Sequence, residues 1–120
     1  MRKLISRQTH GVLDYGYAAL ISAAPAIFDY KDEETATTLS RVVGSGVALT
    51  SLMTRYELGM ISVLPFKAHL DADIVAGLFT MTAPFLFGFS QNKRARNVFV
   101  GMGAFSVLAG LITEPKEMNE

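Results

Sequence analysis

Two histidines and two aspartates stand at a spacing that suits metal or proton chemistry. His10 precedes Asp14 by four residues, and His69 precedes Asp73 by the same interval. Residues four apart share one face of an α-helix, so each pair presents an imidazole and a carboxylate to the same side. These groups tie membrane helices together by hydrogen bonds, which is the simplest interpretation. They also bind Zn, Mn or Fe, with nothing in the sequence favouring one metal, and they mark proton or ion pathways.

The two pairs belong to an internal repeat with a period of 59 residues. Positions 10–54 align with positions 69–113 without a gap, and ten residues are identical. A repeat of fixed period marks duplicated supersecondary units that stack on one another. We therefore predict a single domain over residues 1–120, with repeats at 10–54 and 69–113 joined by a loop at 55–68. The matching positions of the first repeat are His10, Asp14, Ala24, Pro25, Phe28, Ala36, Gly44, Leu49, Leu52 and Thr54.

The elements that carry these residues are apolar enough to cross a membrane. Charged residues form 18% of the chain, against about 25% in soluble domains. Four stretches poor in charge lie at residues 12–28, 42–54, 74–92 and 97–113. A spanning helix needs about 20 apolar residues, and the last two stretches are apolar on every side. We predict an all-α chain of four transmembrane helices, arranged as two helical hairpins in a four-helix membrane bundle.

The arrangement of the hairpins follows from the repeat. Each unit contains two helices, so both units begin on the same side of the membrane and the repeats are parallel. Small residues such as Ala18 and Gly77 share a face with the His–Asp pairs, which predicts that the first and third helices meet along these faces. All four polar residues then form one cluster. Glu57, on the same side, is a further candidate member of this cluster.

Two prolines and the loop at residues 55–68 indicate where the helices end and how the two repeats are connected. Pro25 and Pro84 each remove a backbone hydrogen bond, which predicts a kink or a helix end in the first and third helices. The loop mixes apolar and charged side chains. We expect Tyr56 and Met60 to face lipid in a short interfacial segment.

These features resemble a known family. Each unit has His-xxx-Asp at the entry of its first helix and a proline near the end of that helix. Phe-rich residues follow in the segment Ala-Pro-Phe-Leu-Phe-Gly-Phe that begins at Ala83. The pattern resembles the SPW repeat membrane proteins over residues 10–113, as two copies. Its Ser-Pro-Trp motif reads Ala-Pro-Ala around Pro25 and Ala-Pro-Phe around Pro84. The resemblance implies a small integral membrane protein and brings no established activity.

Composition and motifs narrow the function. The chain has 11 basic and 11 acidic residues without a long basic cluster, which argues against nucleic-acid binding. The absence of cysteine excludes disulfides and thiolate chemistry. No catalytic motif is present. We expect a non-enzymatic structural or assembly module without a cofactor, and the alternative is metal or proton binding by the cluster. The expected partners are the lipid bilayer and either a second copy of the chain or another membrane protein.

Basic residues suggest an orientation. Arg2 and Lys3 precede the first helix, and cytoplasmic flanks of membrane helices are enriched in lysine and arginine. We therefore expect a location in the bacterial plasma membrane, with both termini in the cytoplasm.

Overall fold

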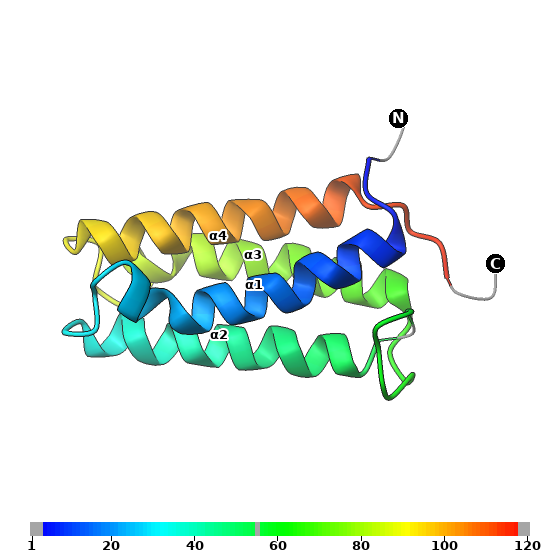
Figure 1. Ribbon diagram of the computed structural model, residues 1–120. Coiled ribbons are helices and arrows are strands. Elements are labelled where there is room, and N and C mark those ends of the chain that lie inside the picture. The colour runs from blue at the N-terminus through cyan, green and yellow to red at the C-terminus, as the bar shows by residue number, and fades with distance from the viewer. Residues whose placement is uncertain (1–3, 55, 118–120) are drawn as a thin grey trace.

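Four helices make up the computed structural model, which describes residues 4–54 and 56–117. They are α1 (Arg7–Ile27), α2 (Glu34–Leu52), α3 (Phe66–Leu86) and α4 (Lys93–Ile112). Figure 1 shows them lying side by side in one bundle, with α1 and α3 beginning at the end where α2 and α4 finish. The prediction of an all-α four-helix bundle is confirmed.

The two helix prolines lie at the C-terminal ends of α1 and α3. Pro25 and Pro84 each stand two residues before the last residue of their helix. Proline lacks an N–H and so disturbs the helical hydrogen-bond ladder. The carbonyl of Pro25 accepts from the backbone N–H of Tyr30, and that of Pro84 accepts from Phe89, both at 2.9 Å. These bonds turn the chain out of each helix towards its partner helix.

Glycines allow the helices of each hairpin to approach closely. A Cβ added to Gly44 of α2 would lie 3.0 Å from the carbonyl oxygen of Ala18 in α1. A Cβ added to Gly103 of α4 would lie 2.6 Å from the carbonyl oxygen of Gly77 in α3. The small-residue faces therefore pack within the hairpins. The prediction that they join α1 to α3 is wrong, because the short connections hold each helix against its neighbour in sequence.

Many large apolar side chains lie on the outer surface of the bundle. The buried interior combines alanines with large aromatic side chains, namely Ala24, Ala36, Ala83, Ala95, Tyr30, Phe66, Phe89 and Phe99. Among the described helices, α4 alone is long and apolar enough by composition to cross a membrane. The exposed large apolar residues of the helices include Val12, Leu20, Ile27, Val42, Leu49, Val75, Leu78, Phe79, Phe85, Phe105, Leu108 and Leu111.

The connector between α2 and α3 is partly folded against the bundle. Tyr56 is only 1% exposed, and its ring centroid lies 5.7 Å from that of Phe66. The prediction that Tyr56 faces lipid is therefore wrong, because its phenol turns inward to a polar partner. Met60, in contrast, is 81% exposed.

Candidate functional site

The two His–Asp pairs meet at one end of the bundle, between α1 and α3. His10 Nε2 lies 2.7 Å from Asp73 Oδ2 and 3.1 Å from Asp14 Oδ1. His69 Nε2 lies 2.9 Å from Asp14 Oδ2 and 3.3 Å from Asp73 Oδ2. One nitrogen or oxygen atom from each of the four residues lies within 4.8 Å of the others. Each imidazole therefore faces the carboxylate of its own helix and that of the other hairpin. We call these four residues the polar centre.

The polar centre is shielded from solvent. His10, His69 and Asp14 are buried, and the side chain of Asp73 is 13% exposed. Placing charged or polar groups in such surroundings is costly unless each has a partner or a bound cation. His69 Nε2 is buried, and among the described residues it makes no well-oriented hydrogen bond. Its distances to the two carboxylates are short, but their directions do not suit a hydrogen bond.

A threonine binds the outer nitrogen of each imidazole. His10 Nδ1 lies 2.8 Å from Thr113 Oγ1, and His69 Nδ1 lies 2.7 Å from Thr54 Oγ1. Each threonine hydroxyl also donates to the backbone carbonyl four residues before it. A hydroxyl has one proton to donate, so the threonine oxygen must accept the Nδ1–H of the imidazole. Both Nε2 atoms therefore point into the polar centre.

Backbone bridges place the two threonines. Thr113 follows the last residue of α4 and forms a bridge with Ile5, just before α1. Thr54 lies just after α2 and forms the equivalent bridge with Leu64, just before α3. Each hairpin thus brings a threonine to the start of the helix that carries the other hairpin's histidine.

The two aspartates differ in their surroundings. Tyr56 donates its phenolic hydrogen to Asp14 Oδ2 at 3.0 Å. Burial raises the pKa of the Tyr56 phenol, so the group remains a hydrogen-bond donor. The position 59 residues later is Pro115, which has no side-chain donor. Asp14 is therefore the more firmly held carboxylate of the polar centre.

Glu57 does not join the polar centre, contrary to the expectation from its place in the loop. Both of its carboxylate oxygens bind the guanidinium of Arg7 at 2.9 Å. The hydrogen bond from Arg7 holds the pKa of Glu57 below its usual value. Because this pair forms at the surface, the carboxylate of Glu57 points away from the buried groups.

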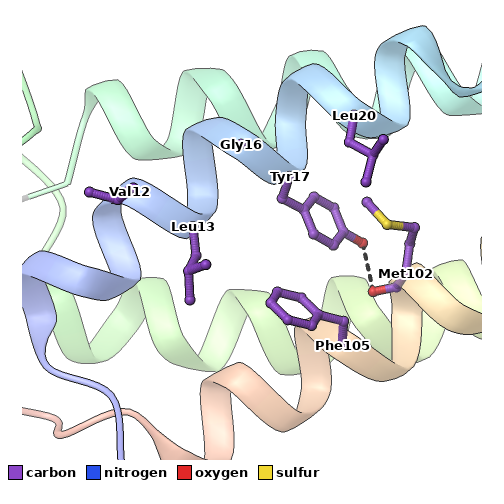
Figure 2. A pocket seen from close by; sticks show the side chains of 7 residues that line it. All are labelled: Val12, Leu13, Gly16, Tyr17, Leu20, Met102 and Phe105. Carbon is purple, nitrogen blue, oxygen red and sulfur yellow. Dashed lines mark hydrogen bonds between the residues drawn. The ribbon is translucent and has the colours of Figure 1, made fainter.

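An apolar groove runs along the side of the bundle between α1 and α4. Figure 2 shows Tyr17 and Phe105 projecting into it, and the Tyr17 hydroxyl donates to the Met102 carbonyl at 3.0 Å. Its volume is about 360 Å³. A groove of about 200 Å³ lies between α2 and α3. The hairpins are thus joined mainly at the polar centre and at an aromatic and alanine core near the other end, which contains Tyr30 and Phe89.

Comparison with known proteins gives one match. The family model described as the SPW repeat domain matches residues 8–113 of the 120-residue chain. The chain belongs to the SPW repeat family. The resemblance seen in the sequence is thereby confirmed, although this SPW repeat protein has alanine at both serine positions of the motif. No curated protein and no solved structure matched the chain. Membership suggests a small membrane protein and assigns it no activity.

The sequence did not place Thr54, Thr113 or Tyr56 at the polar centre. The two threonines form the last identical pair of the repeat. This identity is the one sequence feature that could have indicated their role. Their role depends on where α2 and α4 end, a boundary that sequence patterns locate poorly. Nothing in the sequence pairs Tyr56 with Asp14, because this contact depends on how the connector folds back.

Proposed function

We propose that this SPW repeat protein is embedded in a membrane, with all four helices crossing the bilayer. The large apolar side chains exposed on the outside of every helix carry this proposal. The helices contain 19 to 21 residues, and about 20 residues span the apolar thickness of a bilayer. Two histidines and two aspartates of the helices gather in the polar centre, and most other charged residues stand near helix ends. Arg41 is the exception: it lies on an exposed face about two turns inside α2.

Extraction of membranes with alkaline carbonate tests this placement. The intact chain is expected to stay with the membrane pellet, while peripheral proteins in the same preparation are released. Recovery of the chain in the soluble fraction would contradict a membrane-spanning bundle.

The proposed orientation places both termini in the cytoplasm. The chain has no cysteine, so single-cysteine variants label at one position only. Gln8→Cys and Gln91→Cys form a matched pair, because both side chains are exposed and they lie at opposite ends of the bundle. A membrane-impermeant maleimide applied to intact cells should label the variant at position 91 and spare the one at position 8. The reverse pattern would invert the orientation.

Within this membrane bundle, we propose that the polar centre binds a metal cation. The observation that carries this proposal is the convergence of four ligand groups, with both imidazole Nε2 atoms turned inward. A cation would also meet His69 Nε2, which is buried and lacks a well-oriented hydrogen bond. The two carboxylates supply a charge that balances a divalent ion.

The side chains of the polar centre must shift to bind a metal ion. The four contacts between imidazole and carboxylate atoms measure 2.7 to 3.3 Å. Ligand atoms about 2.0–2.1 Å from a tetrahedral ion such as zinc stand roughly 3.3 Å apart. These pairs therefore need to separate by a few tenths of an ångström to admit the ion. Ligand pairs that stand up to 4.8 Å apart need to approach.

Metal content of the purified protein tests the proposal. The full chain, prepared in detergent without a polyhistidine tag, should hold one ion per chain by elemental mass spectrometry. Asp73→Asn should lose the ion. Asp71→Asn, on an exposed face of the same helix, is the matched control and should keep it. A wild-type chain that binds no ion even after soaking in metal salts would contradict the proposal and favour a structural or assembly module.

A further inference from the structure

The two threonines stand outside the polar centre, yet they determine which atoms face it. Thr54 and Thr113 are buried, and each accepts the Nδ1–H of one histidine. Their own hydroxyl hydrogens are committed to helix carbonyls. If the proton moved to Nε2, the threonine would have to donate to Nδ1 and abandon its carbonyl. The carbonyl of Thr50 or of Ala109 would then lose a hydrogen bond, which is unfavourable.

Aromatic packing holds the imidazole rings in this orientation. The ring of Phe66 meets His10 edge-on at a centroid distance of 5.7 Å and stacks on His69 at 6.2 Å. The two imidazoles themselves lie 5.5 Å apart at 85°. A ring flip would place a ring carbon, Cδ2, against the threonine hydroxyl in place of Nδ1 and so lose this hydrogen bond.

We infer that Thr54 and Thr113 are positioning residues that commit both Nε2 atoms to the ion and select a divalent first-row transition metal. This inference rests on the proposed metal-binding function. Mg²⁺ and Ca²⁺ prefer ligand sets made of oxygen, whereas imidazole nitrogen suits zinc, iron and similar ions. Partners that bind the outer nitrogen of a metal-bound histidine typically contribute 10- to 100-fold to metal affinity. Because two imidazole nitrogens face the polar centre, Zn²⁺ is a suitable ion with which to test binding.

The inference is tested by calorimetric titration of the full chain in detergent with Zn²⁺ and, separately, with Mg²⁺. Thr54→Val and Thr113→Val keep the side-chain shape but remove the hydroxyl. Each should weaken Zn²⁺ binding by about 10- to 100-fold. Thr54→Ser and Thr113→Ser keep the hydroxyl and should restore most of the affinity. Thr82→Val is the matched control, because Thr82 also bonds a carbonyl within its helix but is exposed and contacts no histidine.

The outcomes separate this inference from the proposed function. A wild-type chain that does not bind Zn²⁺ overturns both. Zn²⁺ binding by wild type with unchanged affinity in the valine variants overturns the threonine role alone. Saturable Mg²⁺ binding in the same concentration range as Zn²⁺ overturns the selectivity. The two threonines occupy equivalent positions, so either valine variant tests the role if the other does not fold. Rescue by serine distinguishes positioning from packing.

Discussion

The end of the bundle opposite the polar centre contains two buried positions that differ between the repeats, beside alanines that are the same in both. In the first repeat, the hydroxyl groups of Tyr30 and Ser40 are hydrogen-bonded at 2.7 Å. At the equivalent positions of the second repeat, Phe89 and Phe99 pack edge to face with centroids 5.0 Å apart. All four side chains are buried. Packing at this end therefore accepts either a polar pair or an aromatic pair that fills the space.

The contacts at the polar centre, in contrast, use the same residue types in both repeats. Each histidine has one threonine and faces two aspartates, and the bridges Ile5–Thr113 and Thr54–Leu64 are equivalent. The threonine contacts, and one aspartate contact of each histidine, cross from one hairpin to the other. A particular donor or acceptor is needed there, because a buried polar group without its partner is costly. We infer that filling the available volume is the main requirement at the end that contains Tyr30 and Phe89. At the polar centre, each buried donor and acceptor needs a specific partner.

The largest expected effect is at the polar centre. Asp14→Ala or Asp73→Ala removes one of the two carboxylates that each buried imidazole faces, which should lower the free energy of unfolding by about 3 kcal/mol or more. Because both aspartates face the same two histidines, the double variant should differ from the sum of the single effects by about 0.5–3 kcal/mol. Denaturation of the metal-free chain in detergent measures these values. Strict additivity would show that the carboxylates do not share one network.

The equivalent glycines of α2 and α4 should respond differently to alanine. At Gly103, the new methyl would lie 2.6 Å from backbone atoms of Gly77 and Met81. Gly103→Ala should therefore destabilise the bundle by about 1–3 kcal/mol. At Gly44, the closest atom belongs to the side chain of Ser22, which can rotate away.

The Gly44→Ala variant serves as the comparison for Gly103→Ala in the same unfolding assay. Its cost should be offset by the better helix propensity of alanine, worth about 1 kcal/mol. The prediction fails if the variant at position 44 is the more destabilised of the two.

At the opposite end, Tyr30→Phe should remove one hydrogen bond and leave the Ser40 hydroxyl buried without its partner. We expect a loss of about 1 kcal/mol in unfolding free energy. The double variant Tyr30→Phe/Ser40→Ala removes both polar partners and should recover part of this loss. If the double variant loses the full sum of the two single effects, the polar pair is specifically required. Volume alone would then not explain the packing at this end.

The smallest effect is expected at the turns that follow the helix prolines. Asp29 has a φ of 59°, and its counterpart Gly88 has a φ of 78°. A residue with a Cβ is strained in this left-handed conformation, and glycine is not. Asp29→Gly should stabilise the chain by up to about 1 kcal/mol, while Gly88→Ala should destabilise it by about the same amount. Thermal unfolding in detergent compares the two; equal and negligible shifts would contradict the prediction.

Much of the polar centre was predictable because two simple periodicities act together. Spacing of four residues places His10 with Asp14 and His69 with Asp73 on helix faces, and the 59-residue repeat places both pairs at equal depth. The four-helix fold followed from the charge-poor stretches. Neither inference needs knowledge of how loops fold.

The remaining features depend on tertiary contacts that no local pattern encodes. Glu57 binds Arg7, which lies 50 residues away in the sequence. Tyr56 is buried because the connector between α2 and α3 folds back against the bundle. The small residues Ala18 and Gly77 allow a second helix to pack closely, but the sequence does not determine which helix that is. Helix pairs are decided by the short connections and by the close contacts at Gly44 and Gly103.

The central claim is that the polar centre is a metal site whose imidazole Nε2 atoms bind the ion. X-ray absorption spectroscopy of the zinc-loaded wild-type chain tests it most directly. We predict a four-coordinate first shell of nitrogen and oxygen at about 2.0–2.1 Å, with the outer-shell scattering of two imidazole rings. A first shell without imidazole scattering would contradict the account.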